Sequence, residues 1–215
     1  MGSSRARRHM KCSKCGAVAV INMRQHRLRL CAEHFASWFV KYTERTIEKY
    51  HMLEVGNRVL VAISGGKDSL ALWDVLPQLG YEADGLYIDL GIKGSGAYSL
   101  ESRVKAQAFA DSRGLTLHVV SIQDTYGESI SEVANRSRRG QHKPCSVCGL
   151  VKRHVMNRIG RDRGYAALAT GHNLDDEAAV LMQNTLRWQT GYLARQSPVL
   201  EATDPGLVRK VKPLC

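Results

Sequence analysis

The feature that most constrains the fold is an apolar run that stops at two glycines and is followed at once by a helical pattern. Residues 58–63 read Arg-Val-Leu-Val-Ala-Ile, and a β-branched run of this kind is typical of a strand buried on both faces. After the glycines, residues 68–76 have helical spacing. The same alternation of expected strand and helix recurs at 82–90 and 99–113, 115–122 and 148–164, and 165–170 and 174–188. We therefore expect an α/β fold with a Rossmann-like, doubly wound parallel sheet.

The chain of 215 residues is long enough for one domain and a smaller module. We expect a leader and a small N-terminal zinc-binding module over 1–37, a connecting helix over 38–56, and the α/β domain over 57–215. Two stretches lack a clear period. We interpret residues 123–144 as a long mobile loop, and the tail from Gln189 as poorly ordered into elements.

Charge and composition narrow the class of protein. The net charge of +11 favours polyanionic partners such as nucleic acid, the alternative being a solvated basic surface. No apolar run approaches the roughly 18 residues of a membrane-spanning helix, and no signal-peptide pattern follows the basic N-terminus. We expect a soluble, cytoplasmic protein without a membrane partner, in which the six cysteines stay reduced.

The loop between the first expected strand and its helix has the composition of an anion cradle. It reads Ser64-Gly65-Gly66-Lys67-Asp68-Ser69 and is called the SGGKDS loop below. The glycines let backbone N–H groups approach an anion, and the helix N-terminus adds partial positive charge. The serines offer hydroxyl donors, the lysine a charge for phosphate, and the aspartate a ligand for Mg²⁺. The alternative is a solvent-exposed turn capped by serine.

Ligands of doubly wound sheets bind beyond the carboxyl ends of the strands. This rule places residues 64–69, 88–94 and 171–176 along one rim, with Ala62 and Ile88 near the ends of the first two strands. Gly171 ends a later strand where a nucleotide could lie against the backbone. Asp175 and Asp176 begin the next helix, where aspartate is also favoured simply as an N-terminal capping residue.

Two groups of cysteines have metal-site spacing. Cys145 and Cys148 lie one helical turn apart and suit a shared metal, a structural half-site or a redox pair. Lys152 lies one turn further and could reach nucleotide phosphates. The second group matches a closed tetrahedral zinc site, the alternative being a degenerate knuckle without metal. Its four ligands are Cys12, Cys15, Cys31 and His34.

These motifs carry a resemblance to known families. The SGGKDS loop resembles the PP-loop of the ATP pyrophosphatases, and Pro144-Cys145-x-x-Cys148 with the basic residues after it is similar to the tRNA 2-thiolation enzymes. With the Cys/His module, the combination resembles the tRNA 2-thiouridine synthetases of the T-loop thiolating type and the related wobble-uridine thiolases. The resemblance covers residues 11–214, nearly the whole chain.

The resemblance implies an ATP-dependent tRNA sulfurtransferase that adenylates a uridine and replaces its C2 oxygen with sulfur. It implies ATP, Mg²⁺, Zn²⁺ and a [4Fe–4S] cluster, tRNA as partner, a ubiquitin-like sulfur-carrier protein with a C-terminal thiocarboxylate as donor, and a homodimer. Catalytic roles would fall to Cys145, Cys148, Lys67 and Asp68, with both cysteines also cluster ligands. The nucleotide would contact Ala62, Ser64, Gly65, Gly66, Lys67, Asp68, Ser69, Ile88, Lys152, Gly171 and Asp176.

Two departures from the family pattern and three rival functions stay open. Family members continue past Pro213 with a third cluster cysteine and a second zinc module, and Cys215 is not where that ligand is expected. The rivals are a tRNA 2-thiocytidine synthetase, an ATP-dependent amidating enzyme, and a truncated, non-catalytic protein that binds tRNA or metal.

Overall fold

The computed structural model describes residues 10–92, 98–194 and 196–215, which fall into two compact units divided between Arg45 and Thr46. The helix expected over 38–56 is α1 (Ala32–Lys49), which begins directly after Cys31 and ends seven residues before the expected end. This helix runs across the division between the units. In the described part of the chain, no helix is both long and apolar enough to cross a membrane. The last two residues of the rim segment expected at 88–94 lie outside the described residues.

The N-terminal unit is a small hairpin followed by a helix. Strands β1 (Ile21–Met23) and β2 (Leu28–Leu30) pair antiparallel around the short helix η1 (Arg24–His26). Met23 and Leu30 are buried beside Cys12. The rings of Trp38 and Tyr42 on α1 stack with centroids 4.9 Å apart. A core of this size needs a staple, which is what the Cys/His residues are expected to supply.

The second unit is built on a six-stranded sheet in the order β5-β4-β3-β6-β8-β7. All neighbouring strands pair parallel except the edge pair of β7 and β8. Because the first strand, β3, lies inside the sheet and later strands add on both sides, the sheet is doubly wound as predicted. The strands are β3 (Arg58–Ile63), β4 (Glu82–Asp89), β5 (Leu117–Ser121), β6 (Ala167–Thr170), β7 (Val199–Leu200) and β8 (Lys210–Val211).

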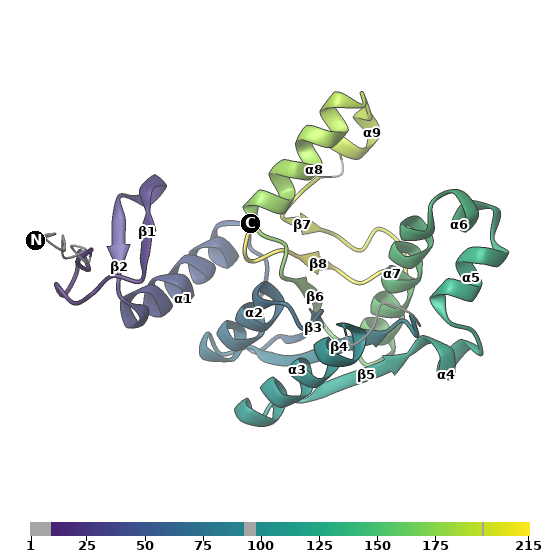
Figure 1. Cartoon of the computed structure of the whole chain (residues 1–215), viewed down its shortest axis with the longest axis horizontal. Coiled ribbons are helices and arrows are strands. Elements are labelled where there is room, and N and C mark those ends of the chain that lie inside the picture. The colour runs from purple at the N-terminus through teal and green to yellow at the C-terminus, as the bar shows by residue number, and fades with distance from the viewer. Residues whose placement is uncertain (1–9, 93–97, 195) are drawn as a thin grey trace, which may run out of the picture. The chain divides into compact units, whose positions relative to one another are not determined.

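Helices cover both faces of this sheet (Figure 1). Helices α2 (Lys67–Gln78) and α3 (Tyr98–Arg113) pack on one face, and α7 (Pro144–Asp162) packs on the other. Residues of β3 alternate accordingly, because Val59 and Val61 face α2 while Leu60 faces α7. The connection that follows β3 runs through α2 on one face, and the connection that leads into β6 runs through α7 on the other face. Because β3 and β6 are neighbours, the gap between these two strands is the switch point of the sheet.

The prediction of a long mobile loop at 123–144 is wrong, because most of this segment is helical. It forms α4 (Ile122–Tyr126), α5 (Ile130–Arg136) and α6 (Arg138–His142), and α7 then begins at Pro144. Local capping explains the difference: Ser121 accepts a hydrogen bond from the backbone of α4, and Ser129 and Glu132 form a capping box on α5. Ile130, Ala134 and Val147 close a small apolar cluster.

The tail is also more ordered than expected. Helix α8 (Leu174–Leu186) is followed by α9 (Thr190–Leu193), and then by β7 and β8 at the edge of the sheet. Strands of two residues are too short to show a period, so the sequence pattern could not have revealed them. None of the residues of α8 is buried in the described part of the chain.

Candidate functional site at the carboxyl edge of the sheet

Hydroxyl groups fold the SGGKDS loop into a closed turn. Ser69 donates a hydrogen bond to the Gly66 carbonyl at 3.0 Å and accepts one from the Ser64 amide at 3.2 Å. The Ser64 hydroxyl accepts from the Gly66 amide at 3.3 Å. Gly66 is the N-cap of α2 and contributes no side chain to cap its first amides. Those amides therefore point out of the turn as an unblocked helix N-terminus.

Two glycines make this compact arrangement sterically accessible. Gly65 has φ +76°, and a Cβ there would lie 2.5 Å from the Ser102 carbonyl oxygen on α3. Gly171, directly after β6, approaches the loop from the other side, since its Cβ would lie 2.8 Å from the Ser69 nitrogen. The loops after β3 and β6 are thus in contact at the switch point of the sheet, where the sequence placed the nucleotide.

The charged residues of the loop form a pair. Lys67 Nζ lies 2.8 Å from both carboxylate oxygens of Asp68, and its side chain is 86% exposed. The hydrogen bond and the charge of Asp68 raise the pKa of Lys67, with a smaller contribution from the charge of Asp176. Lys67 is therefore fully protonated at neutral pH and free to turn from Asp68 toward an incoming anion.

Asp175 and Asp176 begin α8, and both alternatives offered for them retain support. Asn173 caps the helix by accepting from the amides of both residues, at 2.9 and 3.1 Å. Asp176 accepts in return from the Asn173 amide at 3.0 Å, which completes a capping box. Capping thus accounts for the position of Asp176. The negative charge of Asp176 also acts on Lys67, because it contributes to the raised pKa of that lysine.

Ala62 and Ile88 lie near the ends of β3 and β4 on the face covered by α7. Both are half-buried and pack against the apolar cluster between that face and the helix. The small side chain of Ala62 and the branched side chain of Ile88 are both apolar and lie close to the rim. Such residues are suited to form one wall of a nucleotide pocket.

The paired thiols lie at the start of α7. Cys145 is exposed and Cys148 half-buried, and Lys152 follows one turn later, also half-buried. The other end of α7 is anchored at the amino ends of the strands, because Arg58 of β3 donates to the Arg163 carbonyl at 3.2 Å. A helix with its last turn at the amino edge has its first turn toward the carboxyl edge. The topology therefore brings Cys145 and Cys148 to the edge that carries the SGGKDS loop.

Cys215 does not join this pair. It is half-buried and packs against the apolar cluster on the α2 face, opposite the face that α7 covers. Burial, followed by the charge of Glu177, raises the pKa of the Cys215 thiol. The described residues thus bring two thiols to the start of α7, which fits two ligands of an iron–sulfur cluster.

Sequence reasoning missed a group of charged residues beside the loop after β6. Lys212 pairs with Glu177 at 2.7 Å, and their side chains are only 9% and 17% exposed. Burial, then the charges of Lys212 and Arg153, lower the pKa of Lys210. Burial and then Lys210 lower the pKa of His172. Glu177 and Lys212 are 35 positions apart, and Lys212 lies in the tail that lacks a clear period, so no sequence signal connects them.

The Cys/His residues of the N-terminal unit converge as predicted. One ligand atom from each of Cys12, Cys15, Cys31 and His34 lies within 4.8 Å of every other. Cys31 Sγ is 3.2 Å from His34 Nδ1, and Cys15 Sγ is 3.8 Å from Cys31 Sγ. Tetrahedral zinc with metal–ligand bonds of about 2.0–2.3 Å needs spacings of this order. Burial alone would raise the pKa of the Cys12 thiol, but hydrogen bonds from backbone N–H groups outweigh burial and lower this pKa to about 6. The lowered pKa favours the thiolate, which is the form that binds zinc.

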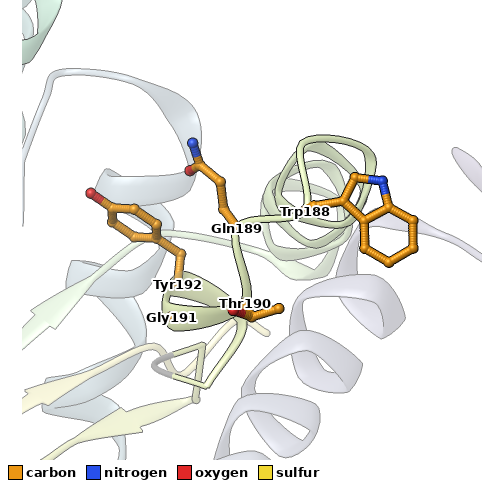
Figure 2. Close-up of a pocket in the computed structure, with 5 residues that line it drawn as sticks. All are labelled: Trp188, Gln189, Thr190, Gly191 and Tyr192. Atoms are coloured by element: carbon orange, nitrogen blue, oxygen red, sulfur yellow. The ribbon is translucent and has the colours of Figure 1, made fainter.

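A hollow of about 440 Å³ lies after α8 and shares no residue with the site above. Figure 2 shows the rings of Trp188 and Tyr192 directed to opposite sides of the turn that forms it. The two aromatic rings do not enclose one ligand between them, so we do not place the nucleotide here.

Comparison with known proteins agrees with both units. Residues 57–203 match the family described as the tRNA methyl transferase HUP domain, and residues 11–36 match the N-terminal LIM domain of the 2-thiouridine synthetase TtuA. The chain belongs to this HUP-domain family. The HUP-domain match covers β3 through β7, and the LIM-domain match contains all four Cys/His residues of the metal centre.

Curated relatives of this HUP-domain chain are tRNA-thiolating proteins. It is 53% identical over 204 residues to the tRNA-5-methyluridine(54) 2-sulfurtransferase of Thermus thermophilus, covering 95% of this chain and 61% of the relative. Identity to the enzyme of the same name from Pyrococcus horikoshii is 44%, covering 95% and 63%. Cytoplasmic tRNA 2-thiolation protein 1 of Drosophila melanogaster is 33% identical, covering 96% and 61%. The chain thus spans about three fifths of the length of these relatives.

A solved structure shares the architecture. The U34-tRNA thiolase NcsA from Methanococcus maripaludis, solved with its [4Fe–4S] cluster, superposes with a TM-score of 0.78 at 27% identity, covering 95% of this chain and 67% of that one. The predicted combination of a parallel α/β domain and an N-terminal Cys/His module is thereby confirmed.

Proposed function

We propose that this chain carries the ATP- and sulfur-handling part of a tRNA sulfurtransferase that makes 2-thiouridine. The observation that supports this most is the shared edge of the sheet. The contact between Gly171 and the SGGKDS loop forms a cradle at the switch point, and the topology directs the Cys145–Cys148 turn of α7 to the same edge. Reduced thiols and a tRNA substrate also suit a cytoplasmic location.

In this proposal the SGGKDS loop holds the phosphates of ATP. The unblocked amides of α2 bind phosphate oxygens, and Lys67 leaves Asp68 to neutralise charge as pyrophosphate departs. Asp68, released from Lys67, and Asp176 would supply carboxylates to Mg²⁺, while Lys152 contacts a phosphate from the α7 side. Ala62, Ile88 and Gly171 form the walls against which the nucleoside lies.

The reaction we propose begins when the C2 oxygen of a uridine attacks the α-phosphorus of ATP. The bond from that phosphorus to the bridging oxygen breaks, pyrophosphate leaves, and the uridine carries AMP at its C2 oxygen. A sulfur nucleophile then adds at C2 and AMP departs with the original oxygen. The residues of the loop act by positioning and by electrostatic stabilisation rather than by covalent chemistry.

Cys145 and Cys148 are the residues we propose for the sulfur step. They would hold an iron–sulfur cluster, which when bound would present the sulfur atom that is transferred. A ubiquitin-like carrier protein with a C-terminal thiocarboxylate would deliver that sulfur, and the assembled enzyme would be a homodimer.

For the position in tRNA, we propose 5-methyluridine 54. Relatives at 41–53% identity have this nucleoside in their name, whereas the wobble-uridine thiolase of known structure is 27% identical. The N-terminal LIM-type module, which matches the 2-thiouridine synthetase family, also favours uridine over cytidine.

Pyrophosphate release tests the assignment of the loop. Lys67→Ala should abolish tRNA-dependent pyrophosphate release, because no other cation of the loop replaces its charge. Lys105→Ala, which removes the charge of another exposed lysine, on α3, should leave release unchanged. Full release from the Lys67 variant would refute the ATP assignment.

Anaerobic reconstitution with iron and sulfide tests the thiol pair. The wild-type chain should develop the visible absorption of an iron–sulfur cluster, and Cys145→Ala should lose it while Cys215→Ala retains it. A spectrum that survives in the Cys145 variant would place the cluster elsewhere.

A further inference from the structure

The outer side of α7 carries basic side chains that the proposed chemistry does not use. Arg153, His154, Arg158 and Arg161 recur at helical spacing and line a groove of about 390 Å³. Gly206 and Leu207, in the segment between β7 and β8, form its opposite wall. The groove therefore lies along one face of the helix whose first turn holds the paired thiols.

Its positive charge is largely uncompensated. No acidic residue lines the groove, and neither Arg153 nor Arg158 takes part in an ion pair among the residues the structure describes. Arg161 pairs with the neighbouring Asp162, and both of these side chains are half-exposed. Uncompensated arginines side by side in a groove favour an anionic ligand.

The groove is also held in shape. The Arg158 guanidinium lies 5.3 Å from the centroid of the Tyr126 ring, which positions the charge without neutralising it. Asn157 accepts a hydrogen bond from the Val208 amide at 2.9 Å and donates one to the Arg153 carbonyl at 2.8 Å. Asn157 thereby ties the wall around Leu207 to the helix that carries the arginines.

We propose that this groove binds the sugar–phosphate backbone of tRNA, an inference that rests on the proposed function. Guanidinium groups match phosphate oxygens in two-pronged hydrogen bonds, and phosphate contacts position a nucleic acid without reading its sequence. Arg158 lies ten residues after Cys148, a rise of about 15 Å along α7. A backbone held at Arg158 therefore stays within a few nucleotides of the thiol end of the helix.

An acidic protein surface is the competing ligand. The residues that dominate interfaces between proteins are usually Trp, Tyr or Arg held in fully desolvated pockets. The apolar side chains of the groove are Leu150 and Leu207, which are 50% and 43% exposed and stand among the cations. The arginines around these two leucines, which have no acidic neighbour in the lining, are what favours a ribose–phosphate chain over a protein contact.

Fluorescence anisotropy with labelled tRNA over a range of salt concentrations tests the proposal. Arg153→Ala/Arg158→Ala should weaken binding roughly tenfold or more near 0.15 M salt and reduce the slope of log K against log salt by about two. The matched control is Lys105→Ala/Arg113→Ala on α3, which removes the same charge and should change Kd less than about twofold. Arg153→Lys/Arg158→Lys should keep most of the slope.

The outcomes separate this inference from the proposed function. If the wild-type chain binds no tRNA, both fail. If it binds and the groove variant binds equally well with an unchanged slope, only the groove is refuted. Unchanged tRNA binding with loss of binding to a thiocarboxylated carrier protein would refute it in favour of a protein ligand. Thermal melting by circular dichroism, with the ATP-induced shift in melting temperature retained, confirms that each variant is folded.

Discussion

At the scale of single residues, the contact between the loop after β6 and the SGGKDS loop depends on Gly171, which has no side chain. Gly171→Ala places a Cβ 2.8 Å from the Ser69 nitrogen and 2.9 Å from the Asp68 carbonyl carbon, both backbone atoms that cannot rotate away. The loop after β6 must then move off the SGGKDS loop. We expect ATP affinity to fall at least tenfold and the free energy of unfolding to fall by about 1–3 kcal/mol, the usual cost of overpacking.

Calorimetric titration with ATP and urea unfolding measure these two effects. Gly191→Ala is the control, because its added Cβ meets nothing within 4 Å and the residue lacks a positive φ. Wild-type ATP affinity in the Gly171 variant would show that the contact between the two loops has no part in nucleotide binding.

At the scale of elements, the sequence predicted the strands and helices that have a long apolar run or a clear helical period. The run 58–63 is β3 to the residue, and the SGGKDS loop leads directly into α2. The helices α4 to α6 were missed because each is five to seven residues long, too short for a 3.6-residue period to show. The cap of α5 is visible in the sequence as Ser129 followed three residues later by Glu132, but the basic residues nearby obscure this pattern.

The capping box of α5 makes a prediction at this scale. Ser129→Ala removes the acceptor of the Glu132 amide and should lower the free energy of unfolding by about 1 kcal/mol, because the site is buried. Urea unfolding monitored by circular dichroism measures the change. Ser112→Ala, an exposed serine within α3, is the control and should be neutral within about 0.5 kcal/mol. Equal stability of the Ser129 variant would contradict the role of the cap in ordering 122–142.

At the scale of the whole chain, two units have different sources of stability. Among the described residues of the N-terminal unit, three buried side chains form the core, so we expect zinc to hold this unit together. Cys31→Ser should abolish stoichiometric zinc binding, measured by native mass spectrometry, and should speed amide exchange in residues 12–31. The urea transition of the α/β unit should change little. A Cys31 variant that keeps one zinc ion would refute the four-ligand centre.

Two histidines of the α/β unit predict how stability depends on pH. Burial, and then Arg163, lower the pKa of His118, and burial, and then Lys210, lower that of His172. The unfolded chain binds protons at the ordinary histidine pKa of about 6.5, while the folded chain resists them. The free energy of unfolding should therefore be greatest above about pH 6.5 and fall as the pH drops below it.

Urea unfolding at pH 7.5 and 5.5 measures this dependence. In His118→Gln/His172→Gln the difference between the two pH values should shrink. His51→Gln, an exposed histidine of the same unit, should leave it unchanged. An undiminished difference in the double variant would assign the pH dependence to other groups.

The central claim is that the nucleotide cradle and the thiol pair act together to put sulfur into tRNA. The most direct measurement is mass spectrometry of nucleosides from tRNA incubated anaerobically with the reconstituted chain, ATP, Mg²⁺ and sulfide. We expect a uridine derivative in which one oxygen is replaced by sulfur, formed only with ATP and absent with Lys67→Ala or Cys145→Ala. Thiolation of cytidine instead, or no thiolated nucleoside from a chain that binds both ATP and tRNA, would contradict the account.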